Sequence, residues 1–276
     1  MSKTTITKQD DGTIILHIMI PQTIIQKTRD EVTADIVKNT TLPGFRKGMA
    51  PKKLVEEKIE PMKLQEDILR KILPDAYTEA IKEMNIKPIV SPKIHVEKIE
   101  EGKDWEFSAT TCEMPEVTLK EYKKNVKDIT AKSKIVIPGK EEKGPNMDEI
   151  MKAVMHNVTV TIPKILIDSE VDRLLAQLLD EIKTLGLSLD QYQASTHKTI
   201  EQIRKDYEER AQKDLTFEFS LQKIADEEKI TISQKEIEEA LLQAKDESER
   251  KNLEANIYLL ATILRQQKTL DFLKHL

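Results

Sequence analysis

Four basic side chains gather in one short stretch of this 276-residue chain, residues 44–53, which holds no acidic residue. Arginine binds a phosphate or carboxylate through two parallel hydrogen bonds, whereas lysine acts as a point charge. An aromatic side chain between two glycines suits insertion into a partner, because the glycines let the loop bend. Composition alone favours a simpler interpretation, a polar turn between helices. The candidate contacts are Gly44, Phe45, Arg46, Lys47 and Gly48, with Lys52 and Lys53 as auxiliary contacts.

A row of three methionines is the second candidate. Met147, Met151 and Met155 stand at positions i, i+4 and i+8, which places them on one face of a helix. Methionine is flexible and polarisable, so such a row can adapt to many apolar partners. The same spacing also fits ordinary core packing, and the sequence leaves both interpretations open. The leucine stripes elsewhere are expected to be core.

Motifs for catalysis, cofactors and metals are missing from the sequence. The five histidines are dispersed, and no Cys/His spacing is typical of zinc. Neither a glycine-rich phosphate loop nor a serine or cysteine nucleophile motif is present. The one cysteine, Cys112, cannot form an internal disulfide. We therefore expect no cofactor, no metal and a binding function rather than an enzyme.

The charge distribution narrows the choice of partner. The chain has 44 basic and 49 acidic side chains, a net charge of −5. Residues 1–129 are neutral, with 22 of each sign, so the excess acid lies in residues 130–276. This balance argues against a general DNA binder, and any anionic partner must be held by a local patch. No apolar run reaches 18 residues and no secretory signal opens the chain, so we expect no membrane contact and a cytoplasmic location.

The elements around the basic stretch are predicted to form an α+β domain. Asp-Gly at residues 11–12 separates two β-prone runs, which is typical of a hairpin turn. Apolar residues then recur at helical spacing on either side of the basic stretch, and Pro74 is expected to kink the second long helix. A second hairpin follows. The predicted strands are residues 4–9, 13–20, 93–99 and 105–112, and the predicted helices are 22–39, 51–59 and 61–84.

The sequence pattern of the second half of the chain predicts mainly helices. Residues 113–147 contain Pro-Gly and Gly-Pro breaks and one aromatic residue, which favours an extended connector. Further on, Thr199 with Gln202 and Ser233 with Glu236 have the spacing of capping boxes. We predict a mainly helical, elongated chain: an α+β domain over residues 1–118, an extended connector over 119–147 and an all-α domain over 148–276. Within the connector, residues 134–137 are β-like. Helices are expected over 148–157, from residue 163 to Gly186 and over 247–274, with a β-like piece at 158–162.

The segment Gly-Phe-Arg-Lys-Gly-Met-Ala-Pro at residues 44–51 resembles the ribosome-docking signature of bacterial trigger factor, Gly-Phe-Arg-x-Gly-x-x-Pro. Residues 72–81 resemble the second long helix of that family's N-terminal domain, and residues 162–172 resemble the opening of a helix in its C-terminal domain. The resemblance implies a nucleotide-independent chaperone that meets nascent chains at the ribosomal exit tunnel. Its implied partners are the large ribosomal subunit, through protein and rRNA, and unfolded or nascent polypeptides.

The sequence departs from the family pattern in two ways. The family's prolyl isomerase domain, of the FKBP type, would stand between the connector and the helical part, where only 35 residues are available. Met49 stands where the family often has lysine. The expected function is therefore a ribosome-associated, ATP-independent chaperone in a short form. Two alternatives stay open: peptidyl-prolyl isomerisation retained in an unrecognised form, and a ribosome-independent chaperone similar to the helical part of periplasmic SurA.

Overall fold

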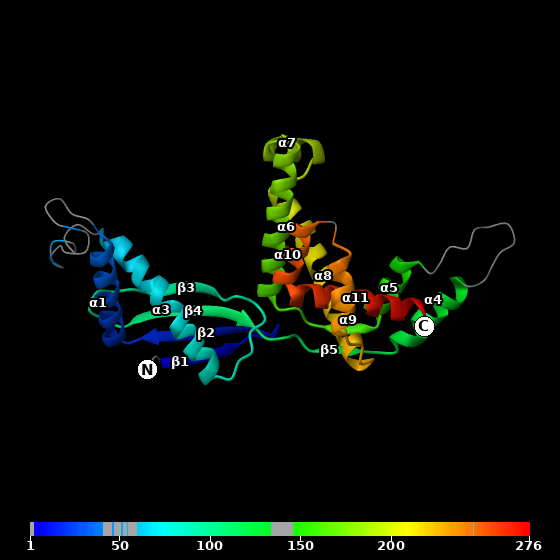
Figure 1. Ribbon diagram of the computed structural model, residues 1–276, viewed down its shortest axis with the longest axis horizontal. Coiled ribbons are helices and arrows are strands. Elements are labelled where there is room, and N and C mark those ends of the chain that lie inside the picture. The colour runs from blue at the N-terminus through cyan, green and yellow to red at the C-terminus, as the bar shows by residue number, and fades with distance from the viewer. Residues whose placement is uncertain are drawn as a thin grey trace. The chain divides into compact units, whose positions relative to one another are not determined.

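The computed structural model describes residues 3–40, 46, 51, 54, 60–133, 146–244 and 246–276 (Figure 1). The chain divides into two compact units. The N-terminal unit comprises residues 1–114 and 163–166, and the helical unit comprises residues 115–162 and 167–276. The mainly helical fold with an N-terminal α+β part is confirmed.

One four-stranded antiparallel sheet lies in the N-terminal unit. Its strands are β1 (Lys3–Lys8), β2 (Thr13–Ile20), β3 (Lys93–Lys98) and β4 (Trp105–Cys112), in the order β1-β2-β4-β3. The two predicted hairpins are confirmed. The structure adds the pairing of β2 with β4, which sets Leu16 opposite Ala109. The sheet forms this way because β2 and β4 carry the most apolar side chains and become the buried inner strands, while the lysine-flanked β1 and β3 remain at the edges.

The Asp-Gly turn between β1 and β2 adopts the predicted backbone. Gly12 has φ 89°, a conformation that favours glycine. The carboxylate of Asp11 accepts hydrogen bonds from the backbone N–H of Thr13 (2.9 Å) and of Lys164 (2.8 Å). Asp11 therefore holds both its own turn and the first residue of a helix far along the chain.

Two long helices cover one face of the sheet, as Figure 1 shows. They are α1 (Gln22–Asn39) and α3 (Pro61–Glu83), whose α-helix continues through Pro74. Their apolar side chains and those of β2 and β4 form one core. The completely or nearly completely buried members include Leu16, Ile18, Ile20, Ala80, Phe107 and Ala109.

The helical unit contains a helix that the sequence did not predict. Helix α4 (Tyr122–Ser133) lies within the predicted extended connector, so the extended conformation is wrong for these residues. Tyr122, Val126 and Thr130 recur at four-residue spacing and are buried, and Tyr122 donates a hydrogen bond to Glu228 (3.1 Å). The surrounding lysines mask this apolar stripe in the sequence. The β-like piece predicted at residues 134–137 lies outside the described residues.

A short antiparallel ladder joins β5 (Val117–Leu119) to β6 (Val158–Val160). The β-like piece predicted at residues 158–162 is confirmed by β6, whereas β5 was not predicted. Helix α5 (Met147–His156) precedes β6. The cores of the unit are built on Val126, Ile150, Val154, Ile224 and Leu273 in one place and on α6 packed against α8 in another. The remaining helices are α6 (Lys164–Thr184), α7 (Leu189–Thr196), α8 (Ile200–Glu227), α9 (Gln234–Leu242), α10 (Glu247–Ala255) and α11 (Ile257–Lys274).

Helix ends in this unit follow the sequence closely. The capping boxes at Thr199 and Ser233 are both formed, and a third occurs at Ser188. Gly186, with φ 70°, ends α6 as predicted. The single helix predicted over residues 247–274 is wrong, because it breaks at Asn256, whose φ of −121° and ψ of 42° are not helical.

Candidate functional site

The basic stretch lies between the end of α1 and the start of α3. Arg46 is exposed, so its guanidinium is available to a partner. The other predicted contacts, Gly44, Phe45, Lys47, Gly48, Lys52 and Lys53, lie outside the described residues, as does most of the predicted helix over 51–59. Leu54, which is described, is also exposed. The docking loop itself therefore stays a prediction.

The two helices that flank this loop are tied to each other. Lys71 of α3 lies 2.9 Å from Glu31 of α1 and 3.8 Å from Asp35. The hydrogen bond from Lys71 lowers the pKa of Glu31, and the same bond raises the pKa of Lys71. At its end α1 is closed by Thr40, whose hydroxyl donates to the carbonyl of Ile36 (2.7 Å). Both helices also share the sheet core, so the loop starts and ends on anchored backbone.

The predicted methionine row lies on α5, whose first turn is capped by Asn146 accepting from the N–H of Asp148 (3.0 Å). Met147, Met151 and Met155 are all half-buried. The fully buried residues of this helix are their neighbours Ile150 and Val154, which face the core. Met147 packs against that same core. A client-binding role for the row stays a prediction.

Large apolar side chains that the sequence did not single out are exposed on the helical unit. Tyr258 is 90% exposed and Leu259 is 61% exposed, both in the first turn of α11. A further set lies around the α6–α7 and α7–α8 connections, where Leu185 is 73% exposed. The sequence does contain a signal for α11: residues 257–260 are four consecutive apolar residues, and a helix can bury only one face. Among the described residues of this unit the set is Leu179, Leu185, Leu187, Ile200, Leu242, Ile257, Tyr258, Leu259 and Ile263. Leu179, which is 42% exposed, belongs to a leucine stripe, so the core position expected for it is wrong.

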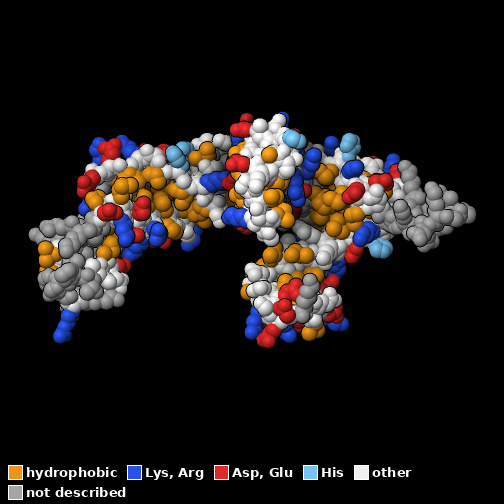
Figure 2. Space-filling model, turned by 90° about the horizontal axis from the view of Figure 1, so that it is seen from above, with side chains coloured by type: hydrophobic (Ala, Val, Ile, Leu, Met, Phe, Trp, Pro, Cys, Tyr) orange, Lys and Arg blue, Asp and Glu red, His pale blue; other side chains and the backbone are white. Residues whose placement is uncertain are grey.

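The helical unit also carries ion pairs on its surface. Along α8, Arg204 lies 3.4 Å from Glu208 and Arg210 lies 3.5 Å from Asp214, both at i, i+4 spacing. Figure 2 shows hydrophobic side chains in patches between acidic and basic ones. A surface of this kind combines apolar contact area with many charges and suits weak, unselective binding of apolar segments.

Among the described residues, the one cysteine has an unreactive thiol and the potential metal ligands do not cluster. Burial raises the pKa of Cys112 to about 11, and the charge of Asp11 adds to the effect, so the thiol stays protonated at neutral pH. Over the described ranges no three His, Cys, Asp or Glu side chains stand close enough to hold a metal ion. Across those same ranges no helix is both long and apolar enough to cross a bilayer.

Comparison with known families gives two matches along the chain. The family described as bacterial trigger factor protein (TF) matches residues 2–141, and the family described as bacterial trigger factor protein (TF) C-terminus matches residues 118–275. The two matches overlap at residues 118–141, so they leave no segment between them for a middle domain.

Individual relatives agree with this assignment. The chain is 39% identical over 116 residues to trigger factor of Staphylococcus carnosus (strain TM300), an alignment that covers 42% of this chain and 26% of the relative. Trigger factor of Staphylococcus aureus (strain JH9) gives the same identity over 27% of its length. The aligned part thus spans about a quarter of these curated relatives.

A solved structure matches the fold along the whole chain. It comes from work on promiscuous substrate recognition in folding and assembly activities of the trigger factor chaperone. The TM-score is 0.64, the identity is 14%, and 99% of each chain is covered. At that identity the match shows a shared fold.

Proposed function

Because the chain belongs to the bacterial trigger factor family, we propose that it is an ATP-independent chaperone that binds unfolded and nascent polypeptides. The observation that carries the proposal is the set of exposed apolar side chains on the helical unit, above all Tyr258 and Leu259 on α11. Covering such groups removes apolar area from water, about 25 cal/mol per Å², against the cost of ordering the bound chain. Weak binding at several such places suits a client that must later be released.

The test of polypeptide binding is suppression of aggregation. A chemically denatured protein is diluted into buffer without nucleotide, and light scattering follows its aggregation. The double variant Tyr258→Ser/Leu259→Ser should suppress aggregation several-fold less well than the native chain, whereas Gln267→Ser, an exposed polar position on the same helix, should be unchanged. If all three proteins suppress aggregation equally, α11 does not contribute to client binding.

We further propose that the chain docks on the large ribosomal subunit near the exit tunnel, in the cytoplasm. Support comes from the family's docking signature at residues 44–51, from the exposed Arg46 and from the anchored helices on either side. Arginine and lysine bind rRNA phosphates through interactions that salt weakens. Ribosome cosedimentation should therefore fall as salt rises.

A pair of charge-reversal variants tests the docking contact. Arg46→Glu/Lys47→Glu should lose most cosedimentation at low salt. The control Arg70→Glu/Lys82→Glu makes the same change of net charge at exposed positions on α3 and should retain it. If both variants lose binding equally, only net charge matters and the loop is not the contact.

The proposal includes no isomerase step, since the two family matches overlap where the family's middle domain would stand. A refolding reaction limited by proline isomerisation tests this point. The chain should accelerate it no more than a non-enzymatic holdase at the same concentration. A clear catalytic acceleration would instead restore the alternative of a prolyl isomerase.

A further inference from the structure

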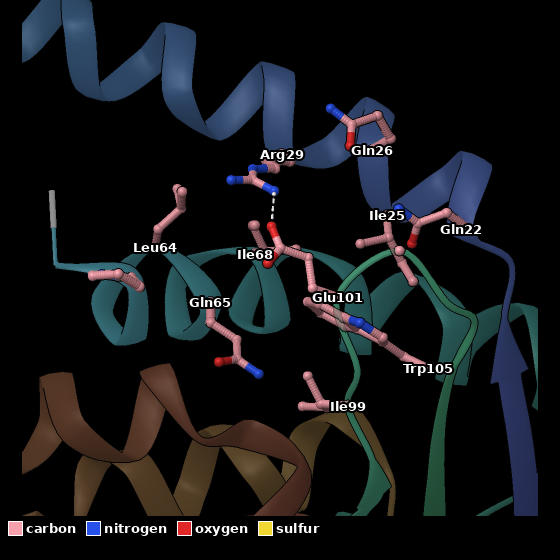
Figure 3. A pocket seen from close by; sticks show the side chains of 12 residues that line it. Gln22, Ile25, Gln26, Arg29, Leu64, Gln65, Ile68, Ile99, Glu101 and Trp105 are labelled. Atoms are coloured by element: carbon pink, nitrogen blue, oxygen red, sulfur yellow. Dashed lines mark hydrogen bonds and ion pairs between the residues drawn. The ribbon is translucent and has the colours of Figure 1, made fainter. Parts of the chain in front are cut away.

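A pocket of about 230 Å³ opens in the N-terminal unit, between the start of α1, the first turns of α3 and the β3–β4 turn (Figure 3). Its apolar walls come from all three elements, so the pocket depends on the packing of the domain rather than on one loop. Cavities for whole cofactors or drug-sized ligands measure about 300–1,000 Å³, so this one suits a single large side chain. The apolar walls are Ile25, Pro61, Leu64, Ile68, Ile99 and Trp105.

One polar atom of this pocket has no partner among the described residues. The side-chain oxygen Oε1 of Gln22 is buried and accepts no hydrogen bond there. The backbone N–H of Gln22 donates to Asp104 (2.8 Å), which fixes the residue at the start of α1. A buried acceptor without a donor costs free energy, and a bound N–H group would recover it. The neighbouring Trp105 is already satisfied, since its indole N–H donates to the carbonyl of Glu100 (3.3 Å).

Two of the residues that line the pocket, Arg29 and Glu101, form an ion pair. In Figure 3, Glu101 reaches from the β3–β4 turn to Arg29 on α1, with Leu64 and Ile68 on one side and Trp105 on the other. The Arg29–Glu101 distance is 3.3 Å, and the Glu101 side chain is 87% exposed. Exposed pairs of this kind contribute little to stability. The pair can therefore swing aside for a ligand without a large cost to the fold.

We propose that this pocket binds one large apolar side chain of an unfolded polypeptide, whose adjacent backbone N–H donates to Oε1 of Gln22. An extended chain offers this combination, since each apolar side chain is flanked by backbone N–H groups at fixed distance. Gln26 and Gln65 also line the pocket and offer further donors and acceptors to the peptide backbone. The inference rests on the proposed function for the nature of the ligand, and it adds a client contact on the N-terminal unit.

The single tryptophan of the chain makes the test direct, because the indole N–H of Trp105 gives one NMR resonance in the ¹⁵N-labelled full-length protein. The probe is an acetylated Gly-Ser decapeptide with one central Phe, and the same peptide without Phe is the reference. The Phe peptide should shift the Trp105 resonance in a saturable manner, while the reference peptide should not. Absence of any shift up to millimolar peptide would overturn the proposal.

Two pocket variants and one control variant separate specific binding from a general effect. Gln22→Met keeps the size of the side chain but removes the acceptor. The affinity for the Phe peptide should therefore fall about tenfold, which corresponds to the loss of one hydrogen bond. Gln9→Met, at an exposed position of the same unit, should bind as the native chain does. Gln65→Phe should fill the pocket and abolish the shift. Unchanged affinity in Gln22→Met and Gln65→Phe would place the peptide elsewhere and overturn the proposal.

The aggregation assay keeps this inference distinct from the proposed function. In one outcome the Phe peptide leaves the Trp105 resonance unchanged, but the native chain suppresses aggregation and the Tyr258→Ser/Leu259→Ser variant fails to suppress it. The pocket inference then fails and the proposed function stands. If the native chain neither binds the peptide nor suppresses aggregation, both fail.

Discussion

Helix α4 gives the sharpest test of the fold, because its sequence predicts an extended connector while its structure is a packed helix. Val126 lies at its centre, is completely buried and contacts the core built on Ile150, Val154 and Leu273. Val126→Ala removes two methyl groups. At about 0.8 kcal/mol for each buried group, with a small cavity term added, the helical unit should lose about 2 kcal/mol of unfolding free energy. The exposed neighbour Lys124 provides the control Lys124→Ala, which should change stability by less than about 0.5 kcal/mol.

Urea unfolding with two probes measures this loss. Trp105 is the one tryptophan and lies buried in the N-terminal unit, so fluorescence reports on that unit, whereas circular dichroism at 222 nm also follows the helical unit. With a slope of about 2 kcal/mol per M, Val126→Ala should lower the urea midpoint of the dichroism transition by about 1 M and leave the fluorescence transition in place. A midpoint equal to that of Lys124→Ala would refute the packing of α4.

Three further predictions address single groups. Hydrogen bonds, first from Lys268 (2.6 Å) and then from Ser233, lower the pKa of Glu236 from its ordinary 4.5 to about 2. The stability that this carboxylate supplies is therefore present above pH 4.5 and lost as the pH falls towards 2, and Glu236→Gln should flatten that part of a pH series of urea midpoints. Cys112, with its pKa raised to about 11, should react with iodoacetamide at pH 8 far more slowly in the native chain than in urea, as mass spectrometry can show. Asp11→Ala removes the acceptor for the Lys164 amide and should cost the N-terminal unit about 1–2 kcal/mol, measured by tryptophan fluorescence.

Local signals in the sequence were sufficient for most elements of the N-terminal unit. The Asp-Gly turn requires a positive φ at Gly12, and the alternation on either side of it predicts strands. The pairing of β2 with β4 joins residues about 90 positions apart, and no short-range pattern specifies it. It follows instead from burial, because the two most apolar strands lower the free energy by becoming the inner pair.

The helical unit shows where sequence periodicity fails. Capping boxes at Thr199 and Ser233 are short-range hydrogen-bond patterns and were predicted correctly. The sequence does not predict helix α4, because lysines surround the narrow stripe of Tyr122, Val126 and Thr130. The hydrophobic periodicity of this segment is therefore weak. Its stability comes from packing on other helices and from the hydrogen bond of Tyr122 to Glu228, both of which are tertiary.

The sequence signals the two kinds of candidate site to different degrees. A basic loop is visible in the sequence because charge type and spacing carry the signal, and Arg46 is indeed exposed. Exposure of an apolar residue is a property of the fold. Leu260 and Leu259 are adjacent and similar, yet Leu260 is 7% exposed and Leu259 is 61% exposed.

The exposed apolar side chains of α11 come directly after a helix that carries ion pairs. An uninterrupted apolar surface would bind a second copy as readily as a client. Here the first turn of α11 follows α10, where Arg250 lies 2.9 Å from Glu254 and Lys251 lies 3.1 Å from Glu247. These pairs add little stability, and they place hydrated charge next in the chain to the exposed apolar side chains. Under the proposed function, a client gains from binding there by contributing its own exposed apolar side chains, which an unfolded polypeptide has and a folded protein largely buries.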